Sequence, residues 1–340
     1  MRRAAAEIEV ATDEGLVPAL AYTDIVGEPQ VGDRVLLNTT AVALGLGTGG
    51  YALVVAIPDR LPADRDEPGH VVKARYTPLQ ATVLAVDEQH SLHHEALRDA
   101  DDIGGMPVVV ADLHSALVPI LAGLRQDGRQ PRVVYVMTDG GALPLAFSRS
   151  VEQLTDAGWL AATVTVGQAY GGDLEAVTLH TGLLAARRVL GADLAVVTQG
   201  PGNLGTGTRW GFSGVASGEA VNAIAALGGR AVASLRISEA DPRERHRGVS
   251  HHSLTALGRV ALAPADVVVP QLPGEFGTAV ATAAAALCPP HRLVSIDVGG
   301  LREAVAAAPT RASTMRRGLD EDLAYFLGCA AAGHHAATLL

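Results

Sequence analysis

The amino-acid sequence predicts an α/β protein in which a small N-terminal β-barrel-like domain precedes a doubly wound, mostly parallel, Rossmann-like sheet. Apolar strand-like runs alternate with helix-like runs from Met106 onward, which is the pattern of a parallel sheet covered on both faces. Short apolar runs separated by Gly and Pro turns come before that point, a pattern typical of small barrels and sandwiches. Hydrophobic residues make up 48% of the 340 residues, which is enough for a large core.

The first hundred residues are expected to form a small β-rich domain with a linker, over residues 1–100. Its strands are expected at 8–10, 17–22, 35–37, 51–57, 70–78 and 82–86. Alternation along the fifth strand places Lys73, the only lysine of the chain, on the same face as Arg75. One interpretation of this face, with Tyr76, is a weak RNA platform.

The α/β domain is expected over residues 105–310. Strands are predicted at 107–111, 133–137, 161–166, 192–198, 231–237, 266–270 and 293–296, and helices at 115–124, 148–157, 174–190, 217–227, 251–262, 275–287 and 301–308. Each strand is too apolar to be half exposed, which favours a buried parallel sheet. Residues 311–340 are expected to form a C-terminal helical segment that packs on the sheet or on a second subunit. The second arrangement would make the protein a homo-oligomer.

Charge and composition exclude several classes of protein. The net charge of −10 argues against nucleic-acid binding, which needs a basic field. We see no uncharged apolar run of about 18 residues, so no membrane span is expected. The basic start of the chain lacks the apolar core of a signal peptide, and the spacing of the two cysteines does not suggest zinc. We therefore expect a cytoplasmic protein.

Ligands of open parallel sheets bind beyond the carboxyl ends of the strands, where the chain order switches. Asp112 and Asp139 directly follow two predicted strands. Asp112 is explained equally well as a helix N-cap, or it shares acid–base work with His114, two residues further on.

The most unusual stretch follows the predicted strand 231–237. Within residues 238–253 it holds three arginines and three histidines: Arg243, Arg245, Arg247, His246, His251 and His252. Ser250 is a plausible N-cap for a helix that begins with the last two histidines. The arginines suit a carboxylate or phosphate, and neutral imidazoles suit a general base. A solvated loop whose Arg and Glu residues pair with each other is the alternative.

A glycine-rich loop follows the strand 192–198. Its candidate ligand-binding residues are Gly200, Gly202, Asn203, Gly205 and Thr206. The loop contains G-x-G-x-x-G, but the next predicted helix begins only at residue 217, whereas a dinucleotide site needs the helix to open at that point. We therefore expect a nest of free N–H groups for an anion, with an unliganded surface loop as the alternative.

Common catalytic motifs are missing. The chain has no P-loop, no H-E-x-x-H and no complete G-x-S-x-G nucleophile elbow. A metal bound by the histidines would need partners from other loops, such as Asp112, His114 or Asp139, and no spacing demands this. No metal ligands and no cofactor are assigned.

Several runs together resemble one family. They are residues 36–42, 44–51, 70–80, 112–115, 137–140, 199–205 and 246–257. With these runs the chain resembles a bacterial family catalogued as domain of unknown function 3866, over nearly its whole length. The resemblance implies no activity, substrate or cofactor.

These observations favour an enzyme that acts on an anionic small molecule bearing phosphate or carboxylate, bound at the carboxyl edge of the sheet. His246, His251 or His252 would move protons, and Asp139 or Asp112 would orient them or share that work. A non-catalytic ligand sensor and a metal-dependent hydrolase in the same crevice are the alternatives. All three require one rim that joins the glycine loop to the histidine stretch.

Overall fold

The computed structural model describes residues 4–64 and 68–340. Its main feature is an eight-stranded sheet in which the paired strands run parallel. In spatial order the strands are β10 (Leu174–Glu175), β9 (Ala162–Thr165), β8 (Val133–Thr138), β11 (Leu194–Gln199), β7 (Pro107–Val110), β12 (Arg230–Ser234), β15 (Asp266–Pro270) and β16 (Arg292–Ile296). The predicted parallel sheet is confirmed.

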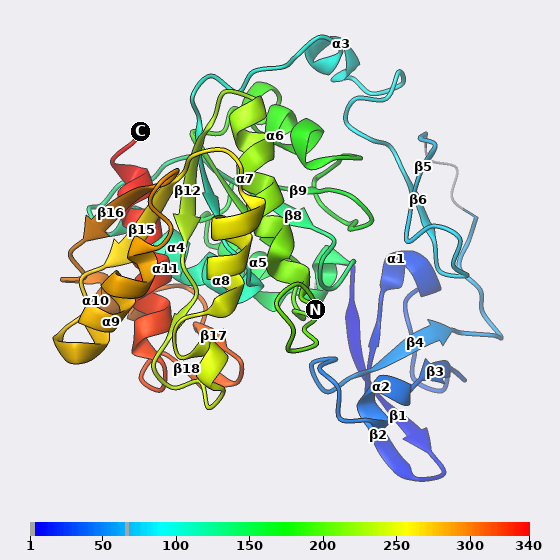
Figure 1. Cartoon of the computed structure of the whole chain (residues 1–340). Coiled ribbons are helices and arrows are strands. Elements are labelled where there is room, and N and C mark those ends of the chain that lie inside the picture. The colour runs from blue at the N-terminus through cyan, green and yellow to red at the C-terminus, as the bar shows by residue number, and fades with distance from the viewer. Residues whose placement is uncertain (1–3, 65–67) are drawn as a thin grey trace.

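Helices cover both faces of this sheet (Figure 1). Val108 and Val110 of β7 belong to one apolar core, whereas Val109 belongs to the other, because successive side chains of a strand point to opposite faces. The first core includes α6 (Leu179–Arg188), α7 (Ala216–Ala226), α8 (His251–Thr255) and α9 (Gly274–Ala285). The second includes α4 (Leu117–Arg125), α5 (Arg149–Asp156), α10 (Leu301–Ala306) and α11 (Leu323–Ala337). The sheet is therefore doubly wound.

The chain enters the sheet near its centre and reverses its direction once. It passes from β7 to β8, β9 and β10, returns to β11 between β8 and β7, and continues through β12, β15 and β16. The connection after β7 leads to α4 on one face, while those after β11 and β12 lead to α7 and α8 on the other. The carboxyl ends of β11, β7 and β12 thus meet at the topological switch point, where open parallel sheets bind their ligands.

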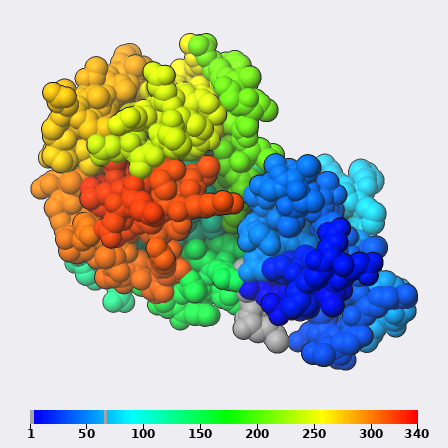
Figure 2. All heavy atoms as spheres, turned by 90° about the horizontal axis from the view of Figure 1, so that it is seen from below, coloured from blue at the N-terminus to red at the C-terminus, as the bar shows by residue number. Residues whose placement is uncertain are grey.

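The N-terminal residues form a smaller lobe beside this body (Figure 2). Its four-stranded sheet has the order β1 (Ala6–Thr12), β2 (Gly15–Ala21), β4 (Ala52–Ala56), β3 (Leu36–Asn38), with the short helices α1 (Thr23–Val26) and α2 (Thr40–Ala43). The core of the lobe is small and includes Ala19, Val26 and Val54. Within the described residues this sheet is open, with β1 and β3 at its edges, so the expected barrel is not confirmed.

A hairpin and a short helix connect the lobe to the body. They are β5 (Val71–Lys73), β6 (Ala81–Val83) and α3 (His94–Leu97). The Nζ atom of Lys73 donates to the carbonyl oxygens of Ala169 and Ala176 at 3.0 and 2.8 Å and lies 3.5 Å from the carboxylate of Glu175. Because Lys73 is fully buried, it fastens the hairpin to the body and cannot take part in the RNA platform that was considered for it with Arg75 and Tyr76.

Two predicted helices differ from the structure. Residues 174–190 were expected to be one helix, but β10 occupies the first two positions by pairing with β9, and α6 begins at Leu179. Residues 251–262 form the short helix α8 followed by a π-helical turn over Ala256–Val260.

No helix within residues 4–64 and 68–340 combines the length and hydrophobicity that a bilayer span requires.

Candidate functional site

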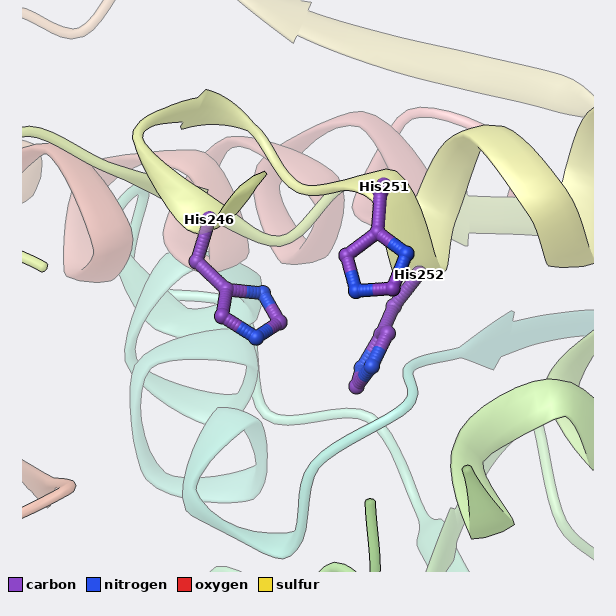
Figure 3. A group of neighbouring side chains, drawn as sticks. All are labelled: His246, His251 and His252. Atoms are coloured by element: carbon purple, nitrogen blue, oxygen red, sulfur yellow. The ribbon is translucent and has the colours of Figure 1, made fainter. Parts of the chain in front are cut away.

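Three histidine rings meet above the switch point. After β12 the chain forms the hairpin β13 (Ile237–Ser238) and β14 (Gly248–Val249) and then enters α8. His246 closes a 3₁₀ turn at the tip of this hairpin, and His251 and His252 begin α8. The ring centroid of His246 lies 5.0 Å from that of His251 and 4.7 Å from that of His252. The centroids of His251 and His252 are 4.4 Å apart. Figure 3 shows the three rings around one shared space.

An aromatic contact fixes one of these rings. Phe212 stacks on His252 with centroids 3.8 Å apart and planes 5° apart. His252 is 4% exposed, and its ring lies between those of Phe212 and His246. Such packing sets the plane of the imidazole before any ligand arrives.

A buried carboxylate and a buried guanidinium face His252 from below. Asp112 Oδ2 lies 3.7 Å from His252 Nδ1 and 3.8 Å from Arg236 Nη1. Arg236 Nη1 lies 3.3 Å from the same imidazole nitrogen. Asp112 and Arg236 are both buried. Asp112 therefore joins His252 as predicted, while Arg236 was not predicted.

Further carboxylates surround Arg236. Asp241 Oδ2 lies 3.8 Å from Arg236 Nη2 and accepts from Arg243 Nη2 at 2.8 Å. Arg317 bridges Asp241 at 3.5 Å and Asp322 at 2.9 Å. Although burial raises it, the hydrogen bonds from Arg243 hold the pKa of Asp241 below its usual value. This network stabilises the charges beneath the histidines.

His246 and His251 are held neutral near pH 7. Burial and the guanidinium groups of Arg236 and Arg243 lower the pKa of His246 to about 3. Burial and the neighbouring His252 and Arg245 also lower the pKa of His251. The Nδ1 atom of His246 is 2.8 Å from Ser250 Oγ, which also accepts from the backbone N–H of His252 as the predicted N-cap.

Two polar atoms of this cluster lack partners. Within the described residues, neither His251 Nε2 nor Asp112 Oδ2 has a hydrogen bond, although both atoms are buried. Buried polar atoms in folded proteins are nearly always bonded. Each such atom therefore marks a place where a water, ion or ligand group belongs.

The glycine loop lies on the same rim. Gln199 Nε2 donates to the carbonyl oxygen of Asp112 at 2.6 Å and to Asn203 Oδ1 at 2.8 Å. Ser213 Oγ also donates to Asn203 Oδ1, at 3.2 Å, and the adjacent Phe212 contacts the histidines. Asn203 and His251 thus lie on the same side of the molecule and are connected through Ser213 and Phe212.

Several backbone N–H groups of this loop, which were expected to be free to bind an anion, already form hydrogen bonds, so that prediction is wrong for them. The N–H of Gly200 donates to Thr138, and that of Thr206 donates to Gly211 at 2.7 Å. Gly205 pairs with Phe212 in an isolated bridge. Gly202 has φ +94°, a left-handed conformation that only glycine adopts without strain. The glycines shape a tight loop, and its side chains provide the polar contacts.

The three predicted arginines differ in their surroundings. The guanidinium of Arg243 donates to both carboxylate oxygens of Asp241 and is therefore already neutralised. Arg245 is exposed, and its Nη2 lies against Gly207, 3.7 Å from where a Cβ would be. Arg247 is exposed as well. Arg245 is therefore the one that connects the histidine stretch to the glycine loop.

Asp139 is not grouped with the histidines. Its Oδ2 accepts from the N–H of Gln168 at 2.8 Å, and its charge acts on Lys73. β8, which precedes Asp139, is separated from β12 by β11 and β7, so three strand spacings of about 5 Å each intervene. The predicted partnership between Asp139 and the imidazoles is not supported by this geometry.

Judged by cavity volume alone, a ligand site would be expected away from the histidines. A cavity of about 520 Å³ lies between the lobe and the body, with Tyr22, Leu145, Ser148 and Tyr170 in its lining. Next to Asp112 there is only a cavity of about 10 Å³, roughly the space of one water. The site at Asp112 is distinguished by its buried polar atoms without hydrogen bonds and not by its volume.

Sequence reasoning missed Arg236 and Phe212. Arg236 is a single charge in the apolar run 231–237, and a charge in a buried strand needs a partner. That signal was sufficient to single it out. Phe212 carries no such signal, because its contact with His252 arises only in the folded loop.

Comparison with known proteins gives a family. No curated protein and no solved structure matched the chain. The profile of the family described as protein of unknown function, DUF3866, matches residues 18–333. That description names no activity, so the chemistry rests on the site itself. Since the match covers most of its length, the chain belongs to the DUF3866 family.

Proposed function

We propose that this chain is an enzyme that acts on an anionic small molecule, one that carries a phosphate or a carboxylate, in the crevice at the ends of β7, β11 and β12. Arg245 attracts the anion from the rim. His246, His251 and His252 offer ring nitrogens beside it. Asp112 orients His252.

One observation carries this proposal: His251 Nε2 and Asp112 Oδ2 are buried without hydrogen bonds in the same cluster. A purely structural cluster would satisfy these atoms, because an unpaired buried polar group costs about 1–3 kcal/mol. Perturbed and unsatisfied groups concentrate where a protein performs chemistry. The place of this cluster at the topological switch point supports the same conclusion.

The test combines binding and turnover. Inorganic phosphate is titrated into the full chain by calorimetry, and hydrolysis is assayed with p-nitrophenyl phosphate and p-nitrophenyl acetate. We expect His251→Gln to lower binding or turnover by at least about 100-fold, the size of a lost acid–base group. His180→Gln, on the exposed side of α6, is the matched control.

Three outcomes decide the matter. Turnover that His251→Gln abolishes supports the proposal. Phosphate binding with no turnover of either ester replaces the enzyme by a ligand sensor. If phosphate does not bind and neither ester is hydrolysed, the proposal is wrong.

A cytoplasmic location is part of the same proposal. Cys288 is exposed and Cys329 is buried, and both are free thiols. Free thiols are typical of reducing compartments.

A further inference from the structure

The three histidines satisfy the geometric requirement for a shared ligand. One ring nitrogen of each lies within 4.8 Å of a ring nitrogen of the other two. A zinc ion bound to three imidazoles needs these nitrogens about 3.4 Å apart. A metal would therefore draw the nitrogens closer, and His251, which is half-buried, is the least confined of the three. The rings already face one space (Figure 3).

The second nitrogen of two rings has a partner that suits this role. His246 Nδ1 lies 2.8 Å from Ser250 Oγ, and His252 Nδ1 lies 3.7 Å from the unpaired Asp112 Oδ2. Metal-bound histidines usually donate their other N–H to a carboxylate or another oxygen. The contact with Ser250 leaves Nε2 of His246 available, alongside the unbonded Nε2 of His251. A proton on His252 Nδ1, directed at Asp112, would leave Nε2 of that ring available as well.

Arg236 presents the competing arrangement. Its Nη1 lies 3.3 Å from His252 Nδ1, and a bond donated there would leave the proton of His252 on Nε2, where it blocks a metal. The carboxylate of Asp112 lies near both groups, with Oδ2 3.7 Å from His252 Nδ1 and 3.8 Å from Arg236 Nη1, and bonds neither. A shift of Asp112 toward His252 Nδ1 would draw the proton to that nitrogen and leave Nε2 for a metal.

The charges around the cluster are balanced without an added cation. Three guanidinium groups face three carboxylates, and these are Arg236, Arg243 and Arg317 with Asp112, Asp241 and Asp322. Arg243, which the sequence assigned to an anion, is neutralised by Asp241. The attraction of an anion therefore needs positive charge beyond these arginines. A divalent ion on the imidazoles supplies it.

We propose that His246, His251 and His252 bind a divalent transition-metal ion, of which zinc is the best fit to three imidazoles. One coordination position stays open for water or for an oxygen of the anionic substrate. The identity of that substrate class rests on the proposed function, whereas the metal site itself does not. The open position would lie toward Arg245, on the rim.

The experiment uses the full chain after dialysis against EDTA. Zn²⁺ is titrated in competition with a chromophoric chelator, and Co²⁺ is added separately to read its visible absorption. We expect one equivalent of each ion. His251→Gln should weaken Zn²⁺ binding by more than about 100-fold, since two ligands remain, while His180→Gln leaves it unchanged. His251 is half-buried, so this variant should fold, and circular dichroism checks that it does.

The outcomes separate the two proposals. If Zn²⁺ fails to bind, or binds equally well to His251→Gln, the metal site is wrong. Phosphate binding that still depends on His251 would then leave the proposed function intact, with the imidazoles acting on protons directly. One-to-one Zn²⁺ binding without any binding or turnover of phosphate or esters would keep the metal site and overturn the proposed function.

Discussion

His114 and His251 show two ways to bury an imidazole. His114 Nδ1 lies 2.9 Å from the hydroxyl of Tyr135, and its Nε2 lies 2.7 Å from Ser148 Oγ. Tyr135 in turn contacts Thr198 Oγ1 at 2.9 Å. His251 Nε2, by contrast, is buried without a bond. Both histidines lie near the carboxyl edge of the same sheet.

The difference separates structural polar groups from functional ones. A buried network whose members are all bonded stabilises one conformation, whereas a partly bonded network costs stability. His114 belongs to the first kind and links β7, β8 and the start of α5. The histidine cluster belongs to the second kind, and a bound ligand would supply its missing contacts. Replacing His114 should therefore lower the stability of the fold, whereas replacing His251 should weaken ligand binding and leave the stability nearly unchanged.

The largest effect is expected for His114→Ala. It removes one hydrogen bond from each of the hydroxyls of Tyr135 and Ser148 and opens a cavity, which should lower the free energy of unfolding by about 2–4 kcal/mol. His251→Gln should change it by less than about 1 kcal/mol. Urea unfolding at pH 7 measures both. A large loss of stability in His251→Gln would show that this residue is structural too.

A second effect comes from the pH dependence of stability. Burial lowers the pKa of His114 to about 4, below the value of about 6.5 in an unfolded chain. Between these values the unfolded chain binds a proton that the folded chain does not. The free energy of unfolding should therefore fall as pH drops from 6.5 to 4, by up to about 3 kcal/mol, and His114 should contribute nothing further below pH 4.

His114→Ala isolates this contribution. Because other groups titrate alike in both proteins, the drop in stability between pH 7 and pH 4.5 should be smaller in the variant by about 2–3 kcal/mol. Urea unfolding at the two pH values measures it. Equal drops in the two proteins would mean that His114 is charged in the folded chain, against the comparison drawn above.

Much of the fold was predictable from the sequence because a buried parallel strand is apolar throughout. The run at 133–137 became β8, and the run at 266–270 became β15. Strand order was not predictable, since no residue in β11 records that it lies between β8 and β7. This insertion is the reason that Asp139 was wrongly grouped with the histidines. β10 was missed because its pairing with β9 overrides the helical pattern of residues 174–190.

Of the site, the residues close together in sequence were predictable and the long-range partners were not. His246, His251 and His252 share one short stretch, and Asp112 directly follows a strand. Asp241, which neutralises Arg243, is only two residues away and was overlooked. The contact of Asp241 with Arg317 joins residues 76 apart, and only the fold brings them together. The sequence therefore overestimated the positive charge available to an anion.

A smaller effect is expected for Asp112→Asn. This change keeps all three imidazoles but removes the carboxylate that faces His252 Nδ1, so Zn²⁺ affinity should fall by about 10–100-fold. The Co²⁺ absorption should also shift, which a merely structural role would not cause. Asp139→Asn is the matched control, because its carboxylate bonds Gln168. Equal losses in both variants would contradict the separation of Asp139 from the site.

The smallest effect is expected at the rim, where Arg245 and Arg247 provide a matched pair of exposed arginines. Arg245 lies against Gly207 and its charge acts on His251, so Arg245→Gln should weaken phosphate binding by about 5-fold at low salt, as expected for one exposed charge. Arg247→Gln should change it by less than about 2-fold. In about 1 M salt the Debye length shrinks to about 3 Å, and the Arg245 effect should largely disappear. Equal losses in the two variants would mean that phosphate responds to net charge alone and that Arg245 does not form the mouth of the crevice.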